Sequence, residues 1–183
     1  MNIGKLIADA TKSIAQSYFQ LPIDGREDPI YRERVYCYEL YHQLRLRWPV
    51  DVGYELSGEV DKSGHPLIRG NNLDRTKPDL LIHTPGNMDG NHAIIEVKPI
   101  SASRSGIAKD LSTLTAFRRF AGYQRAIYLI YGSGNIDTVI TISNELQIDD
   151  SEERLDLTLI EFWWHRRVGM PAIRVPNDLS TNH

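Results

Sequence analysis

Residues 78–99 place the strongest constraint on the fold of this chain. Two apolar runs of strand length, residues 78–83 and 93–99, flank a connection that is rich in Gly, Pro, Asn and Asp. Turn-forming residues between two apolar runs are typical of a β-hairpin. The segment therefore predicts two paired strands joined by a longish loop over residues 84–92.

The second strand of this hairpin ends in charged residues. Because side chains alternate along a strand, Glu96 and Lys98 share one face while their apolar neighbours share the other. On the first strand Asp79 follows Pro78, where its carboxylate can lie beside Glu96. Two carboxylates and an amine in one place are costly to bury unless something binds them, and a divalent cation is the obvious ligand.

The pattern Pro78-Asp79, sixteen intervening residues, then Glu96-Val97-Lys98 resembles the PD-(D/E)XK nuclease superfamily. The resemblance implies an α/β fold of the restriction-endonuclease-like type, with a central mixed β-sheet flanked by helices. It also implies Mg²⁺-dependent, or Mn²⁺-dependent, hydrolysis of phosphodiester bonds, with DNA favoured over RNA. In such a site Asp79, Glu96 and the carbonyl of Val97 would hold the metal. Lys98 would hold or deprotonate the attacking water.

A helix predicted for residues 29–47 supplies a further carboxylate. Its apolar stripe includes Glu33, and a charged residue on the core side of a helix asks for a reason. Members of the superfamily often carry a Glu on the helix before the sheet, so we expect Glu33 to join the catalytic residues. Two alternatives stay open: Glu39 takes this role instead of Glu33, or Glu33 only caps the helix or complements its dipole.

A second helix is predicted for residues 107–121, after a flexible lead over residues 101–106. The region is basic, with a single acidic residue at Asp110. Four of its side chains are our first choice for phosphate contacts: Arg104, Lys109, Arg118 and Arg119. The alternative is that these charges form the solvated face of an amphipathic helix.

The remaining pattern predicts further elements on both sides of these motifs. At the N-terminal side we expect an amphipathic helix over residues 1–19, a loop over residues 21–28, a strand over residues 49–60, and an irregular segment over residues 67–77. At the C-terminal side we expect a strand covered on both faces over residues 125–131 and further β-structure over residues 138–143. Residues 145–153 are expected to form an acidic loop that lies away from the binding face or contacts a basic partner. A last strand over residues 155–165 and a loose tail over residues 171–183 complete the prediction.

Trp163, Trp164 and His165, followed by two arginines, combine aromatic and basic side chains in a way that suits stacking on nucleic acid. The favoured interpretation is an aromatic cluster that closes the core.

Length and composition limit the remaining choices. A chain of 183 residues with one cysteine predicts a single domain, residues 1–183, without internal disulfides or a cysteine-based zinc site, and a cytoplasmic location. No apolar run approaches the ~18 residues of a membrane span. A net charge of −3 requires that any nucleic-acid affinity come from a local patch. We expect a homodimer or a partner protein; the competing function is a non-catalytic module that binds nucleic acid or protein.

Overall fold

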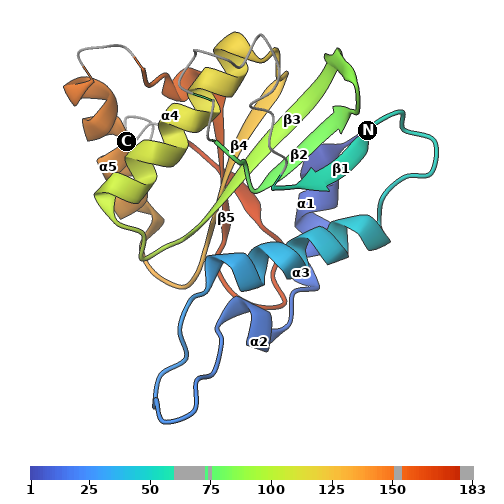
Figure 1. Ribbon diagram of the computed structural model, residues 1–183. Helices are drawn as coiled ribbons and strands as arrows, with labels where there is room; N and C mark the ends of the chain where they lie inside the picture. The colour runs from blue at the N-terminus through green and yellow to red at the C-terminus, as the bar shows by residue number, and fades with distance from the viewer. Residues whose placement is uncertain (60–72, 74–75, 151–153, 178–183) are drawn as a thin grey trace.

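The chain forms an α/β structure around one six-stranded sheet, as the computed structural model in Figure 1 shows for residues 1–59, 73, 76–150 and 154–177. The helices are α1 (Ile3–Lys12), α2 (Gln16–Phe19), α3 (Glu33–Leu46), α4 (Arg104–Phe120), α5 (Ile136–Asp149) and the 3₁₀ turn η1 (Leu157–Leu159). The strands are β1 (Glu55–Gly58), β2 (Leu80–Thr84), β3 (Asn87–Pro99), β4 (Arg125–Tyr131), β5 (Ile160–His165) and β6 (Ile173–Val175). The predicted α/β class with a mixed sheet flanked by helices is confirmed.

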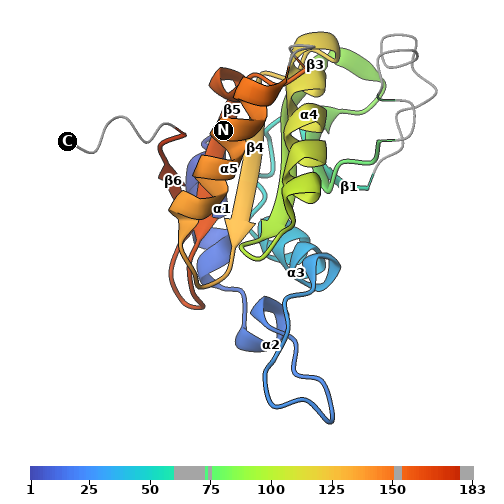
Figure 2. The same cartoon turned by 90° about the vertical axis from the view of Figure 1, so that its left-hand side faces the viewer.

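The strands lie in the sheet in chain order, β1 to β6. The β1–β2, β2–β3 and β5–β6 pairs are antiparallel, whereas β3–β4 and β4–β5 are parallel. A parallel pair needs a long connection that crosses one face of the sheet, and α4 and α5 supply these connections. These two helices pack side by side (Figure 2).

Alternating side chains of the strands build a separate apolar layer on each face of the sheet. Ile95 and Val97 of β3 pack on the side of α1, α2 and α3, whereas Ile94 packs on the side of α4 and α5. Strand β4 is buried on both faces, as its continuous apolar run predicts. Glu96 and Lys98 therefore leave β3 on the α4 side.

The hairpin is tighter than predicted, because residues 87–92 belong to β3 rather than to a loop. Pro85 and Gly86 make the turn, and Gly86 has φ +75°, a conformation that glycine adopts without steric cost. The pairing of β2 with β3 shifts its register twice near His83, which accommodates the extra residues of β3. Gly90 is needed there, since a Cβ atom would lie 2.5 Å from the side chain of Thr84.

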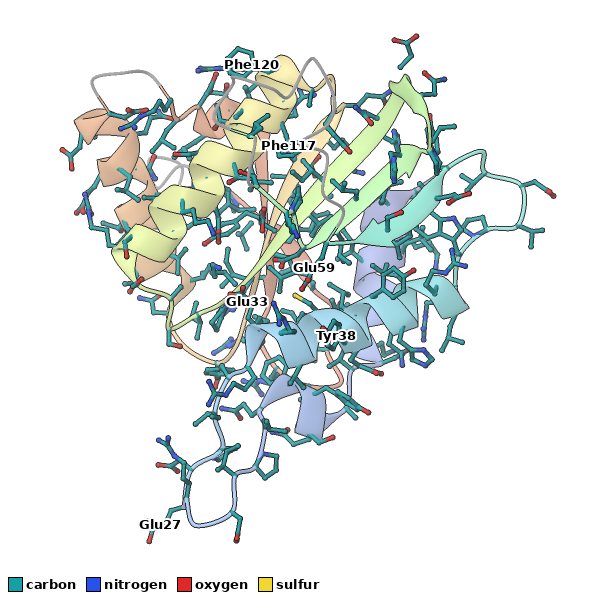
Figure 3. All side chains as sticks on the ribbon, in the orientation of Figure 1. Glu27, Glu33, Tyr38, Glu59, Phe117 and Phe120 are labelled. Carbon is teal, nitrogen blue, oxygen red and sulfur yellow. The ribbon has the colours of Figure 1, made fainter. Side chains whose placement is uncertain are left out.

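Two predictions in the N-terminal part are wrong. The expected helix over residues 1–19 is divided into α1 and α2. The next helix begins at Glu33 rather than at residue 29, because the backbones of Leu21 and Ile30 form a β-bridge with hydrogen bonds of 2.8 and 3.0 Å. Ile30 is thereby held extended, and the loop that the bridge closes projects away from the body of the molecule, with Glu27 near its tip (Figure 3).

The prediction of β-structure over residues 138–143 is also wrong, since these residues lie within α5. The run is rich in β-branched residues, which favoured a strand. The buried positions Ile136, Val139, Ile140 and Ser143 nevertheless follow helical spacing, and Asn135 caps the helix by accepting a hydrogen bond from the Asp137 amide. Residues 145–149 of the expected acidic loop are helical too; residues 151–153 lie outside the described residues.

Other element boundaries differ from the predictions. The strand expected over residues 49–60 is reduced to β1, the last strand begins at Ile160, and α4 begins at Arg104, within the expected flexible lead. Part of the expected loose tail pairs with β5 as β6. Most of the irregular segment over residues 67–77 lies outside the described residues. At the end of α4, Phe117 is buried whereas Phe120, expected on the same apolar face, is exposed (Figure 3). Among the described helices, none combines the length and apolarity that a membrane crossing requires.

Candidate active site

Asp79 is held at the start of β2 by the backbone of the neighbouring strand. Its Oδ2 atom accepts a hydrogen bond of 2.8 Å from the Val97 amide. Burial raises the pKa of Asp79, although this hydrogen bond favours the charged form. The carboxylate is thus fixed in place at some electrostatic cost.

Glu96 lies next to this carboxylate and is almost fully buried, with 7% of its surface exposed. Burial, together with the charges of Asp79 and Asp110, holds the pKa of Glu96 well above its usual range. Two acids are therefore crowded into one desolvated place, where a cation that contacts both of them would be stabilising.

Lys98 extends from the same face of β3 and contacts two further acids. Its Nζ atom lies 2.8 Å from Oε2 of Glu33 and 3.2 Å from Oδ2 of Asp110. Burial disfavours the ammonium, but the contacts with Glu33 and Asp110 outweigh it and keep the pKa of Lys98 above its ordinary value. Lys98 is therefore positively charged at neutral pH in this arrangement.

The two glutamates that compete for the helix position are placed differently. Glu33, the first residue of α3, accepts a hydrogen bond of 2.8 Å from Nζ of Lys98. Glu39 accepts a hydrogen bond of 2.7 Å from Nε2 of Gln43 on its own helix. The geometry thus brings Glu33 to the hairpin residues; its catalytic role stays a prediction.

Asp110 is a member of the site that the sequence interpretation missed. It lies on α4, is 4% exposed, and has a pKa raised to about 6, chiefly by burial. A signal was present, since Asp110 falls three residues after Ile107 and four before Leu114, on the core side of the helix. A carboxylate at such a position needs a partner, and Lys98 is that partner.

These side chains line one polar cavity of about 250 Å³. Its lining residues come from α3, the β1–β2 region, β3 and α4: Glu33, Arg34, Glu59, Thr76, Lys77, Asp79, Glu96, Lys98, Lys109, Asp110 and Thr113. Among the described residues, no three His, Cys, Asp or Glu side chains are arranged as a ready-made cation cage. The predicted metal ligands Asp79 and Glu96 nevertheless share this cavity, together with Lys98.

Only part of the predicted basic surface reaches this cavity. Lys109 is in its lining. Arg104 forms ion pairs with Glu145 and Asp149 of α5, at 2.5 and 2.8 Å. Two of the residues predicted to form an acidic loop thus pair with Arg104, the first residue of the basic helix α4.

The two arginines at the end of α4 also have partners. Arg118 donates to the carbonyl oxygen of Tyr123, and Arg119 lies 3.3 Å from Asp156. Both contacts are made within the chain.

The aromatic residues of β5 belong mainly to the interior. Trp163 is 8% exposed and His165 is fully buried, where Nδ1 of His165 lies 2.8 Å from the hydroxyl of Tyr36. Trp164 is partly exposed and Arg166 lies over its ring. Core packing accounts for Trp163 and His165.

Comparisons of the chain with family models, with curated proteins and with solved structures return no match.

Proposed function

We propose that this chain is a metal-dependent nuclease with a restriction-endonuclease-like core, which hydrolyses phosphodiester bonds of nucleic acid, with DNA favoured. The observation that carries the proposal is the convergence of Asp79, Glu96, Lys98 and Glu33 on one cavity. A strand-end pair of acids with a lysine two residues further on is the arrangement that the motif predicts.

The order of the elements supports the same fold assignment. Helix α3 precedes the antiparallel strands β1 to β3, and helix α4 then leads to the parallel strand β4. The motif residues lie at the start of β2 and near the end of β3, where the two helix layers approach each other. This is the context in which the motif is informative.

The chemistry of the acids fits a hard divalent cation such as Mg²⁺ or Mn²⁺. Burial raises the pKa of both Asp79 and Glu96, and the charge of Asp79 raises that of Glu96 further; a shared cation would relieve this cost. These carboxylates, with the carbonyl of Val97, would hold the ion. When bound, the ion supplies Lewis-acid activation of the phosphodiester and of water.

The other residues have distinct tasks in the proposed reaction. Because Lys98 is held as an ammonium, it donates hydrogen bonds to a phosphate oxygen or to the attacking water and balances developing negative charge. Glu33 and Asp110 hold the Nζ atom of Lys98 from two sides. Lys109 is available at the rim for the phosphate backbone. A homodimer would bring two such cavities to one substrate molecule.

A cleavage assay tests this proposal. Purified protein is incubated with single- and double-stranded DNA and RNA, with Mg²⁺, with Mn²⁺ or with EDTA. We expect cleavage only with a divalent ion, and a loss of at least about 100-fold in Lys98→Ala. The matched control is Lys5→Ala on α1, an exposed lysine whose contact is with Asp9.

Two results would overturn the nuclease assignment. Absence of cleavage on every substrate would favour a non-catalytic binding module. Undiminished cleavage by Lys98→Ala would assign the activity to another site or to a contaminant.

A further inference from the structure

A second cavity adjoins the candidate active site. It has a volume of about 360 Å³ and lies between α3 and the β1–β2 edge of the sheet. Its lining residues are Cys37, Tyr38, Tyr41, Gly58, Glu59, Asp79 and Leu80. Apart from two acids, this lining consists of tyrosines, apolar side chains and a glycine, unlike the charged lining of the first cavity.

The two cavities share a wall. Asp79 and Glu59 line both of them, and Asp79 is also a proposed metal ligand. Figure 3 shows Glu33 and Tyr38 on the same helix, with Glu59 at the end of β1 opposite them. The second cavity therefore continues from the first at Asp79 and Glu59, in the direction in which a ligand bound at Lys98 can extend.

The lining of the second cavity suits a flat, largely apolar ring. Tyr38 is 62% exposed, an unusual exposure for a large aromatic side chain, while Leu80 and Cys37 are buried behind it. Burial raises the pKa of the Cys37 thiol, which stays neutral and acts as an apolar surface. Tyrosine rings are platforms on which nucleobases of any sequence stack.

Glu59 adds a hydrogen-bond acceptor at the mouth. Within the described residues it is the one non-glycine residue with positive φ, at +47°. Its Oε1 atom lies 3.5 Å from Nε of Arg34. A carboxylate so placed accepts a hydrogen bond from a donor on the edge of a base, such as N3–H of thymine or the exocyclic amino group of adenine or cytosine.

We propose that the second cavity receives an unpaired nucleobase from the nucleotide next to the phosphate at Lys98. This inference rests on the proposed nuclease function and specifies its substrate class. A base inside a duplex cannot enter such a cavity without leaving the stack, so single strands, flaps or loops are the substrates.

Base binding is measured separately from cleavage. In a Lys98→Ala background with Mg²⁺, fluorescence anisotropy compares a labelled thymidine 12-mer with a 12-mer of the same charge whose inner nucleotides are abasic. We expect about tenfold tighter binding of the thymidine strand, and loss of this preference when Tyr38→Ala is added. The matched control is Tyr18→Ala, a partly exposed tyrosine on α2 that does not line either cavity.

A second variant blocks the cavity instead of removing its platform. A Cβ atom at Gly58 would meet its nearest atoms, from Asp79, Leu80 and Tyr41, at 3.5–3.9 Å, which is ordinary contact. The strand therefore accommodates a Cβ atom at this position, and we expect Gly58→Val to place its two methyl groups in the cavity. We expect it to reduce the preference for bases as Tyr38→Ala does.

The outcomes separate the subsite from the chemistry. If wild type cleaves abasic and thymidine strands equally, and Tyr38→Ala binds both as before, the subsite is wrong and the nuclease function stands. Equal cleavage of duplex and single strands also overturns the subsite. If no substrate is cleaved but the preference for bases depends on Tyr38, the subsite is supported and the nuclease function falls.

Discussion

Asp110 and Lys98 form an ion pair of 3.2 Å at the junction of the two layers that cover the sheet. Asp110 belongs to α4 on one face, whereas the other partner of Lys98, Glu33, belongs to α3 on the opposite face. A single ammonium therefore links both helices to the end of β3. Because this ammonium is the proposed catalytic group, each contact that orients it has an expected effect on the reaction.

The substitution Asp110→Asn tests the role of Asp110 as a positioning residue. The amide keeps the volume of the side chain but removes one of the two charges that hold Lys98. We expect about a tenfold fall in kcat with little change in KM, because Asp110 does not contact the substrate. Steady-state kinetics and a circular dichroism melt check this. Unchanged kcat, or a rise in KM alone, would contradict the positioning role.

The pair Glu33→Gln and Glu39→Gln decides which glutamate of α3 serves the site. Glu33 contacts Lys98, whereas Glu39 contacts Gln43, so only the first substitution alters the charge beside the proposed catalytic lysine. We expect Glu33→Gln to lower kcat/KM by about 10–100-fold and Glu39→Gln to lower it less than twofold. Equal losses in both variants would assign the effect to helix stability, which thermal melts of the two proteins measure.

Glu96→Gln should make the protein more stable while removing its response to metal. The pKa of Glu96 is raised in the folded state, so the ionised carboxylate costs stability at every pH above its unfolded value of 4.5. A neutral amide removes this cost, and we expect the free energy of unfolding at pH 7 with EDTA to rise.

Mg²⁺ provides the second measurement on this variant. By mass action Mg²⁺ should raise the Tm of the wild type and leave that of Glu96→Gln unchanged. Urea unfolding and melts with and without Mg²⁺ test both expectations. A variant that still responds to Mg²⁺ would place the ion elsewhere.

Lys109→Ala and Arg104→Ala separate the basic residues of α4. Lys109 lines the polar cavity, whereas Arg104 is paired with two acids of α5. We expect Lys109→Ala to weaken nucleic-acid binding several-fold and to reduce the slope of log K against log salt by about 1. Arg104→Ala should leave both unchanged. A larger effect of Arg104→Ala would show that its ion pairs open when nucleic acid binds.

We expect the buried, neutral His165 side chain to contribute to the free energy of unfolding at neutral pH, and this contribution to be lost in mild acid. Burial lowers the pKa of His165 from 6.5 to about 4, so the unfolded chain binds a proton more readily than the folded one. The contribution is present above pH 6.5 and disappears as the pH falls toward 4. It amounts to about 3 kcal/mol.

Urea unfolding at pH 7.5, 6 and 5 measures this contribution. The comparison with His165→Gln isolates it from Asp79, Glu96 and Asp110, whose raised pKa values act in the opposite direction. A stability difference between the two proteins that is independent of pH would contradict the prediction.

The parts of the site that lie on strands could be predicted because strand geometry is simple. A period of two places Glu96 and Lys98 on one face, and the Pro78-Asp79 pair marks the start of the neighbouring strand. The position of Glu33 followed from an acid on an apolar helix stripe. The basic residues around Asp110 hide it in the sequence, because the net charge of the region is positive. Its spacing along α4 nevertheless places it on the buried side of the helix.

The errors in secondary structure have a common physical cause. Local preference favoured β-structure for the β-branched run in α5, whereas two parallel strands on either side required a crossing helix. Likewise, the start of α3 depends on the bridge between Leu21 and Ile30, a pairing that residues 28–33 alone do not reveal. Long-range pairing decided both cases.

The hydrogen bond from the Val97 amide to Asp79 has a consequence for how this site tolerates sequence change. The donor is a main-chain group, so every residue at position 97 except proline supplies it. Substitution there can alter the packing beneath the sheet while the first acid keeps its orientation. A lineage that conserves only two acids, a lysine and their strands can therefore drift until little of its remaining sequence is shared.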